Sequence, residues 1–199
     1  MYMRGTFIVI EGPDASGTTR QSSFLAERIQ REQAEKELLV TAEPTSGSIG
    51  QTIRTLLHGE EMPQADAMQL LFCADRAQHL ALEILPALEA GKIVISDRYE
   101  LSTIIYGAAL GLDEQWLRNL NNQFLKPDIT IIALPPFEVC MERMHNRNTR
   151  DQYEKQEFQK KVYDGYAALN EPNSFFVDTS QTKEASAEEI WAHIEPILK

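Results

Sequence analysis

The chain has 199 residues, of which 43% are hydrophobic, so it can bury a full core within one domain. Its net charge of −11 argues against a nucleic-acid-binding surface, because phosphate backbones attract basic proteins. A small nucleotide can still bind where basic residues cluster locally. Cys73 and Cys140 show no CxxC spacing, which favours two reduced thiols in a cytoplasmic protein. We expect no membrane contact, since no apolar run approaches the roughly 18 residues of a membrane span and no signal segment is recognisable.

Five short apolar runs predict β-strands, and the stretches between them show helical periodicity. The predicted strands cover residues 6–11, 38–41, 92–97, 129–134 and 174–177. The predicted helices cover residues 18–35, 48–57, 64–90, 113–124, 136–146, 154–169 and 184–198. Runs such as IVIS and ITIIAL are apolar on both faces, which is typical of a parallel sheet covered by helices on each side. The sequence therefore predicts one doubly wound α/β domain over residues 1–199, with a five-stranded parallel sheet.

The first predicted strand leads into a glycine-rich segment, GPDASGTT, at residues 12–19. Gly12 and Gly17 have the spacing of a phosphate-binding loop, in which backbone N–H groups surround phosphate oxygens at the start of a helix. Thr19 stands where a hydroxyl binds Mg²⁺, but Thr18 stands where such loops usually carry lysine. The segment predicts nucleotide phosphate binding and leaves open which residue supplies the positive charge.

Acidic residues end three of the predicted strands, namely Glu11, Glu43 and Asp97. Ligands of doubly wound sheets bind at the carboxyl ends of strands. Asp97 can hold a Mg²⁺-bound water there, and Arg98 can bridge the oxygens of a phosphoryl group in transfer. A strand-end salt bridge is the alternative for this pair, but the phosphate loop in the same sheet favours the functional role.

The predicted helices carry further candidates for ligand binding. Arg54 follows the turn-rich segment EPTSGSIG and can clamp a phosphate, or it can be an ordinary surface residue. Phe72 and Arg76 are four residues apart and share one helix face. Their ring and guanidinium can stack on a base and bind its edge, although an aromatic residue on a helix is more often part of the core.

A basic segment, MERMHNRNTRDQYE, occupies residues 141–154 of this acidic chain. Arg143, Arg147 and Arg150 concentrate positive charge there, and the polar residues 146–152 predict a loop between two helices. Such a loop, at about 144–154, can close over phosphates and stabilise transition-state charge. A solvated helix end with favourable cations would account for one or two of these arginines but less well for three.

Taken in order, these segments resemble thymidylate kinase, a nucleoside monophosphate kinase family that phosphorylates dTMP with ATP. The resemblance covers nearly the whole chain through FIVIEGPDASGTTRQ, EPTSGSIGQTIRTLL, LLFCADRAQH, SDRYELSTIIYG, the basic segment and VDTSQT. Phosphate loops are widespread, but FCADRAQH followed by SDRY is quite specific. The resemblance implies a five-stranded parallel sheet, transfer of the γ-phosphate of ATP to dTMP with Mg²⁺, and a homodimer that packs through the long helix among others.

The resemblance also implies roles on the acceptor side. Asp14 would hold the sugar 3′-hydroxyl, Phe72 would stack on thymine and Arg76 would donate to its edge. Tyr106 would lie against the deoxyribose and disfavour a 2′-hydroxyl, while Arg54 and Arg98 would hold the acceptor phosphate. The implied substrate-binding residues are Asp14, Glu43, Arg54, Phe72, Arg76, Arg98 and Tyr106.

On the donor side, Thr19 and Asp97 would organise Mg²⁺, and Arg143 would pack on adenine with residues 178–181 on its other side. The implied ATP-binding residues are Gly12, Ala15, Ser16, Gly17, Thr18, Thr19, Arg20, Arg143 and Ser180. The implied catalytic residues are Asp97, Arg98, Arg147 and Arg150.

The chain departs from the family pattern at several positions. Thr18 stands where many members have lysine, Arg20 where they have threonine, and Gly107 where many bacterial members have glutamine. Ala15 replaces an arginine of some eukaryotic relatives, so we expect Arg147 and Arg150 of the basic segment to supply the missing charge. Two alternatives remain open: a kinase for another nucleoside or nucleoside monophosphate, because of Gly107, and a catalytically impaired nucleotide-binding dimer, because of Thr18.

Overall fold

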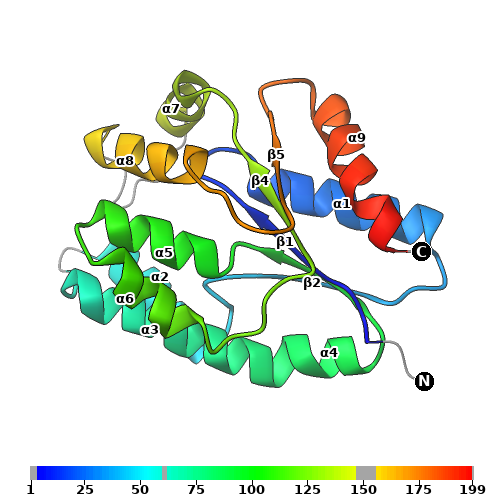
Figure 1. Ribbon diagram of the computed structural model, residues 1–199, viewed down its shortest axis with the longest axis horizontal. Coiled ribbons are helices and arrows are strands. Elements are labelled where there is room, and N and C mark those ends of the chain that lie inside the picture. The colour runs from blue at the N-terminus through cyan, green and yellow to red at the C-terminus, as the bar shows by residue number, and fades with distance from the viewer. Residues whose placement is uncertain (1–3, 60–61, 147–155, 199) are drawn as a thin grey trace.

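The computed structural model describes residues 4–59, 62–146 and 156–198, and its centre is a parallel sheet (Figure 1). The strands lie in the order β2-β3-β1-β4-β5. They are β1 Phe7–Glu11, β2 Leu38–Ala42, β3 Ile93–Asp97, β4 Ile129–Ala133 and β5 Ser174–Val177. Every paired strand is parallel to its neighbour. The predicted fold class is thus confirmed, and each strand lies within one residue of its predicted range.

Helices lie on both faces of this sheet (Figure 1). Apart from the helices between residues 65 and 109, they are α1 Thr18–Glu32, α2 Ser48–His58, α6 Glu114–Asn121, α7 Phe137–His145, α8 Gln156–Ala167, α9 Lys183–Ile194 and the 3₁₀ turn η2 Glu195–Ile197. The helix predicted at 64–90 consists of α3 Ala65–His79, a π-helical turn η1 Leu80–Ile84 and α4 Leu85–Glu89. Pro86 stands in the first turn of α4, directly after the π-helical turn, and has no N–H to donate to the preceding turn of this continuous helix.

One helix, α5 Glu100–Ala109, has no counterpart among the predicted elements. Its sequence, ELSTIIYGAA, is buried at seven of its ten positions, Glu100 and Gly107 included. A helix that is covered nearly all round shows no amphipathic stripe, and its β-branched residues favour a strand by propensity. Packing against α3, α6 and α8 overrides that propensity.

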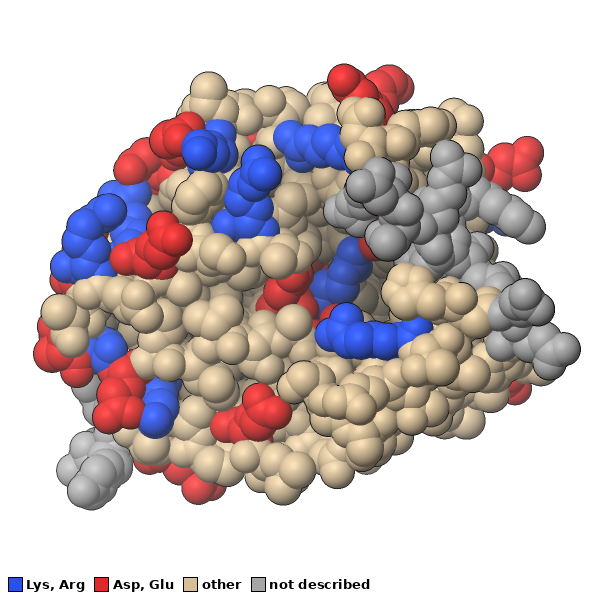
Figure 2. All heavy atoms as spheres, turned by 180° about the vertical axis from the view of Figure 1, so that it is seen from behind, with Lys and Arg blue, Asp and Glu red and all other residues tan. Residues whose placement is uncertain are grey.

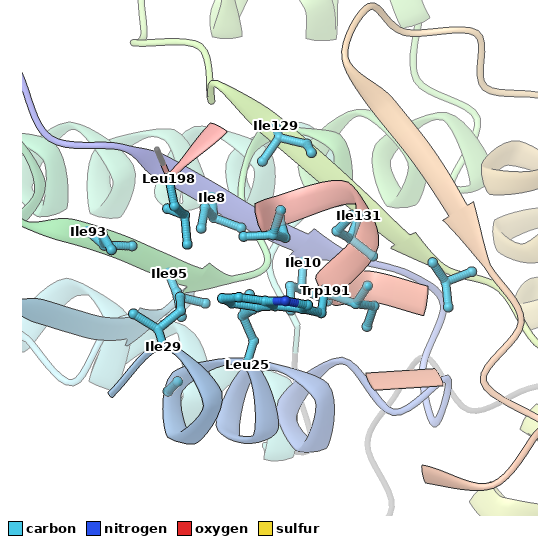
Figure 3. Close-up of a cluster of buried hydrophobic side chains, with 14 residues drawn as sticks. Ile8, Ile10, Leu25, Ile29, Ile93, Ile95, Ile129, Ile131, Trp191 and Leu198 are labelled. Carbon is cyan, nitrogen blue, oxygen red and sulfur yellow. The ribbon is translucent and has the colours of Figure 1, made fainter. Parts of the chain in front are cut away.

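The core has two layers because consecutive strand residues point to opposite faces of the sheet. Ile8 and Ile10 pack with Leu25 and Ile29 of α1 and Trp191 of α9 (Figure 3). The alternate residues of the same strand lie in a second cluster with η1 and α4, made up of Phe7, Val9, Leu80, Ile84, Ala87, Leu88, Val94 and Tyr99. Both faces of the sheet are therefore covered, and only its edges and the ends of its strands remain for ligands.

The register of the central strands brings their carboxyl ends together. Ile10 of β1 lies opposite Asp97 of β3, and Ala42 of β2 lies opposite the same aspartate. The segments that follow these strands therefore start together, at the carboxyl end of the sheet. None of the described helices is long and apolar enough to cross a membrane.

Candidate active site

Two cavities meet at the carboxyl end of the sheet, and Asp14 and Arg98 line both of them. The smaller, of about 100 Å³, is lined by Asp14, Glu43, Pro44, Leu57, Phe72, Arg76, Arg98, Tyr99, Ser102, Thr103 and Tyr106. The larger, of about 550 Å³, is lined by Asp14, Ala15, Ser16, Gly17, Thr18, Thr19, Arg20, Gln21, Arg98, Arg143, Thr179, Gln181 and Lys183. Figure 2 shows a hollow in the molecular surface where basic and acidic side chains lie together. The arrangement provides two adjoining compartments with a charged boundary.

The glycine-rich loop forms one wall of the larger cavity. Gly17 has φ +99°, a conformation that glycine adopts without steric cost. A β-carbon on Gly12 would lie 2.5 Å from the carbonyl oxygen of Ala133, so the loop passes close to β4 only because glycine is there. Thr18 and Thr19 then begin α1, and the first N–H groups of a helix favour anions. The loop has the backbone of a phosphate site, and buried Thr18 adds no charge to it.

The side chains of Thr19 and Asp97 meet beside this loop. The Thr19 hydroxyl donates to Oδ2 of Asp97 over 2.5 Å. The other carboxylate oxygen of Asp97, Oδ1, is buried and has no hydrogen-bond partner among the described residues. A hydroxyl beside an unpaired carboxylate oxygen is a donor set that suits Mg²⁺, which prefers oxygen ligands. These two residues thus fit the metal that the sequence leads us to expect.

Arg98 is held in a defined position by several partners. Its backbone has φ +72°, and Nη1 donates to the carbonyl oxygen of Gly12 and to the Ser102 hydroxyl, each over 3.0 Å. Nη2 donates to Oδ1 of Asp14 over 2.5 Å. The pKa of Arg98 lies well above its usual value: burial lowers it, but the electrostatic influence of Tyr106 and Asp14, among others, outweighs burial. Arg98 is therefore a permanent cation aimed at the boundary between the two cavities.

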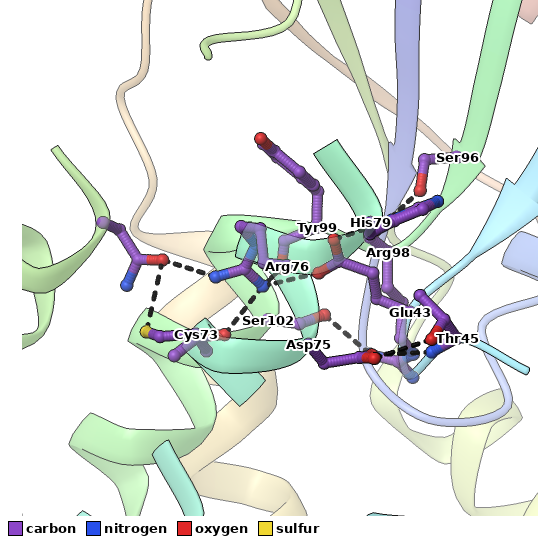
Figure 4. A network of polar contacts seen from close by, with 12 residues as sticks. Glu43, Thr45, Cys73, Asp75, Arg76, His79, Ser96, Arg98, Tyr99 and Ser102 are labelled. Carbon is purple, nitrogen blue, oxygen red and sulfur yellow. Dashed lines mark hydrogen bonds and ion pairs between the residues drawn. The ribbon is translucent and has the colours of Figure 1, made fainter. Parts of the chain in front are cut away.

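A second arginine, Arg76, lies fully buried in the wall of the smaller cavity. Its Nη2 donates to Oε2 of Glu43 over 2.7 Å and to the Tyr99 carbonyl and Thr103 hydroxyl, each over 2.9 Å (Figure 4). Nη1 donates to Oδ1 of Asn121. Burial lowers the pKa of Arg76, but Glu43, Cys73 and Tyr99 together outweigh burial and raise the pKa above its usual value. Both oxygens of Glu43 have partners, because His79 lies 3.0 Å from Oε1, so Glu43 holds Arg76 in place; its contact with a substrate stays a prediction.

Of the remaining residues expected on the acceptor side, two line the smaller cavity and one does not. Phe72 and Tyr106 line the smaller cavity, and the guanidinium of Arg98 lies 5.4 Å from the centre of the Tyr106 ring. Arg54 is exposed, donates to the carbonyl oxygen of Pro44 and lines neither cavity. Its contact with a phosphate stays a prediction.

On the donor side, Arg143 reaches the glycine-rich loop from α7. Its Nη2 donates to the Thr179 carbonyl oxygen over 2.7 Å, and Nη1 lies 3.4 Å from the carbonyl oxygens of Ala15 and Ser16. Ser180 is exposed and lies outside the cavity lining, although its neighbours Thr179 and Gln181 belong to it. The expected catalytic residues Arg147 and Arg150 fall outside the described residues, as does most of the segment 144–154.

Several residues support the site through contacts that were not predicted from the sequence. Gln159 of α8 is buried and donates to Oδ2 of Asp14 over 2.9 Å. Glu11 accepts from the backbone N–H groups of Tyr99 and Ser102 over 2.9 and 3.1 Å and so holds the start of α5. The Tyr166 hydroxyl donates to the same carboxylate over 2.8 Å. The sequence signal for these contacts was the presence of polar residues at buried positions of α5 and α8. This signal could not be used for α5, because that helix was not predicted.

Comparison with known proteins matches this sequence to one family. The thymidylate kinase family model matches residues 10–190. A probable thymidylate kinase of Pyrococcus horikoshii is 41% identical over 175 residues, 85% of this chain and 84% of that protein. Thymidylate kinases of Thermomicrobium roseum and Exiguobacterium sibiricum are 39% and 37% identical and cover 97% and 99% of this chain, and 96% and 97% of their own lengths.

The chain belongs to the thymidylate kinase family. The family predicted from the order of its motifs is thereby confirmed. Thymidylate kinases are enzymes whose substrates are ATP and dTMP. An enzyme that brings two nucleotides together in one reaction needs two adjoining binding sites, and the two cavities have this arrangement. The departures at Thr18 and Gly107 are therefore variations within this family and not signs of another one.

Proposed function

We propose that this protein transfers the γ-phosphate of ATP to dTMP, giving dTDP and ADP for dTTP synthesis, with the larger cavity as ATP site and the smaller as dTMP site. The observation that carries the proposal is that Asp14 and Arg98 line both cavities. Phosphoryl transfer depends mainly on positioning two anionic groups and stabilising the charge between them. Arg98, which is charged at all ordinary pH values, stands where these two phosphates would meet.

In the dTMP site, the nucleobase would stack on Phe72 with Arg76 at its edge. Arg76 keeps one donor for this purpose, because Nε is buried and has no partner among the described residues. The sugar would lie near Tyr106 and Asp14, and its phosphate near Arg98. The acceptor phosphate is already largely ionised at neutral pH, so no general base is needed.

In the ATP site, the glycine-rich loop and the first turn of α1 would hold the phosphates, and Arg143 and the segment around Ser180 would lie near adenine. Thr19 and Asp97 would hold Mg²⁺, which when bound neutralises charge on the transferring phosphates. Thr18 provides no ammonium, so we propose that Arg147 and Arg150 close over the phosphates from a lid at about 144–154 of a single kinase domain.

A coupled assay of ADP release tests the proposal. Turnover with ATP and dTMP, and a kcat/KM for dTMP above those for dUMP, other monophosphates and thymidine, would support it. Faster turnover with one of the other acceptors would indicate a kinase of different specificity. ATP binding without turnover would indicate an impaired nucleotide-binding protein. The family assignment favours neither alternative.

We also propose a homodimer that packs along the continuous helical segment from α3 to α4. Exposed leucines lie on this segment: Leu70 is 50% exposed, Leu82 68% and Leu85 39%. Light scattering should give the mass of two chains, and Leu82→Glu should give the mass of one. Two buried, unlinked thiols, Cys73 and Cys140, support a reducing, cytoplasmic location.

A further inference from the structure

The side-chain amide of Gln69 is buried and makes no hydrogen bond within the described part of the chain. Gln69 lies on α3 and has no exposed surface. Neither its Oε1 nor its Nε2 has a partner among the residues that the structure describes. A buried amide without partners lowers stability, since it has lost its bonds to water and gained none in return. An apolar residue of the same size would fill this space at lower cost, so the amide calls for another explanation.

Gln69 shares its helix face with the proposed base-binding residues. It precedes Phe72 by three residues and Arg76 by seven, which places all three on one side of α3. Its Cδ lies 3.3 Å from the position that a β-carbon on Gly107 would take. Gly107 directly follows Tyr106, which lines the smaller cavity. The amide therefore lies just behind the wall of that cavity, between α3 and α5.

The absence of a side chain at Gly107 makes room for this arrangement. A β-carbon there would lie 2.8 Å from both methyl carbons of Leu117, closer than carbon atoms pack. The space beside Tyr106 is thus filled by side chains from α3 and α6. Gln69 of α3 thus brings a carboxamide beside position 107, where many bacterial members of the family have glutamine.

Arg76 supplies a second unsatisfied group on the same face. Its Nε is a buried donor without a partner among the described residues, while its other nitrogens are engaged with Glu43, Asn121, Tyr99 and Thr103. A fixed donor and a carboxamide thus flank Phe72. The edge of thymine presents two carbonyl oxygens with the N3–H donor between them. Arg76 can donate to one carbonyl, and Gln69 can accept from N3–H and donate to the other carbonyl.

We propose that Gln69 is a specificity-determining residue, whose carboxamide turns toward the pyrimidine edge when dTMP enters the smaller cavity. This inference rests on the proposed function, because it requires the nucleobase to stack on Phe72. It accounts for an amide that has no partner among the described residues, since the hydrogen bonds of this amide form only with substrate. It also explains how a base contact persists in a chain that has Gly107.

The test begins with wild-type turnover of dTMP, whose absence would overturn the proposed function itself. In Gln69→Met, a side chain of similar length replaces the amide. We expect KM for dTMP to rise about 10-fold, the effect of one lost hydrogen bond, with KM for ATP unchanged. The melting temperature of the free enzyme should rise, because a buried polar group without partners has been removed. Gln69→Leu, measured in parallel, provides a second apolar variant should methionine pack poorly.

The N3-methyl derivative of dTMP provides the specificity readout. Wild type should prefer dTMP over this analogue. The ratio of kcat/KM for dTMP to kcat/KM for the analogue should fall about 10-fold in Gln69→Met, because the group that accepts a hydrogen bond from N3–H has been removed. Gln78→Met makes the same change at an exposed position of the same helix and should leave every parameter at its wild-type value. If both Gln69 variants keep the wild-type KM and the wild-type ratio while wild type turns over dTMP, the inference is overturned. A lowered melting temperature with unchanged specificity would overturn it as well, since it would assign Gln69 to the fold.

Discussion

The guanidinium of Arg98 lies 2.5 Å from Oδ1 of Asp14, at the boundary of the two cavities. Gln159 holds the other oxygen of Asp14 over 2.9 Å, so the carboxylate keeps its position when Arg98 moves. In the proposed reaction, an incoming phosphate would compete with Asp14 for the same guanidinium. The pair would then keep the arginine ordered and charge-balanced until substrate binds, after which Asp14 would be available to another group.

Replacing Arg98 should therefore affect catalysis more than folding. Arg98→Lys keeps the charge but loses the forked donor geometry, and we expect kcat to fall about 10³-fold, the lower range for arginines that contact a transferring phosphoryl group. Steady-state kinetics and thermal unfolding would be measured together. Arg31→Lys, on the exposed surface of α1, is the control and should change neither. A kcat within threefold of wild type for Arg98→Lys would exclude this role.

The pairing of Thr19 with Asp97 leads to a prediction about metal dependence. Asp97→Asn keeps the shape of the side chain but removes the negative charge that would attract Mg²⁺. The concentration of Mg²⁺ required for half-maximal activity should rise by about 10-fold or more. Titration of activity with Mg²⁺ at saturating ATP and dTMP measures this shift. Asp164→Asn, on the exposed surface of α8, should leave the titration unchanged. Equal curves for Asp97→Asn and wild type would remove Asp97 from the metal site.

The buried ion pair of Glu43 with Arg76 predicts a large loss of stability when it is broken. Their side chains are 5% and 1% exposed, so Glu43→Ala leaves a guanidinium without its counter-charge in the interior. We expect a loss of about 3–5 kcal/mol in the free energy of unfolding, measured by urea denaturation. Glu32→Ala, which removes an acid from the helix surface, should cost less than about 1 kcal/mol. Similar losses in both variants would show that water reaches Arg76.

The strands could be predicted closely from the sequence because their apolar runs are short and stop at an acidic residue or a proline. Asp97 illustrates this, since the run IVIS stops there in both the prediction and the structure. Helix α5 was missed because burial on nearly all sides removes the periodicity by which a helix is recognised. The same omission concealed Ser102 and Thr103, although both stand in the segment SDRYELST.

The loop and strand-end parts of the candidate site were also accessible to sequence reasoning. Asp14, Thr19 and Asp97 lie in local motifs whose spacing follows from backbone geometry. Asn121 and Gln159 carry no such signal, because each contacts a residue more than forty positions away in sequence and only the packing of helices brings them together. Long-range partners of this kind require the structure.

The loop position Thr18 offers a test of where the missing cation comes from. If Arg147 and Arg150 supply it, the double variant Arg147→Ala/Arg150→Ala should lose about 10³-fold in kcat. Adding Thr18→Lys to that variant should restore at least about 10-fold, because a lysine at this place reaches the β- and γ-phosphates. Thr18→Val fills the same buried space without charge and should restore nothing. An unchanged kcat in the double variant would contradict the compensation hypothesis.

The buried hydroxyl of Tyr99 predicts how stability changes at alkaline pH. The group is 1% exposed and has no hydrogen-bond partner among the described residues, and burial raises its pKa far above the value of about 10 in an unfolded chain. Tyr99 therefore stays protonated in the folded state while the unfolded chain loses the proton. The stabilising contribution is complete below pH 10 and is lost as pH rises further, by about 1.4 kcal/mol per pH unit.

Tyr99→Phe should remove this alkaline loss while keeping the ring that packs edge-on against Phe7 at 5.2 Å. At pH 8 the variant should be as stable as wild type or more stable, because an unpaired buried hydroxyl is gone. Above pH 10 its free energy of unfolding should fall less steeply with pH than that of wild type. Urea denaturation at pH 8, 10 and 10.5 measures both effects. Tyr163→Phe, at a partly exposed ring, should change the slope less, and equal slopes for wild type and Tyr99→Phe would mean that the hydroxyl ionises in the folded protein.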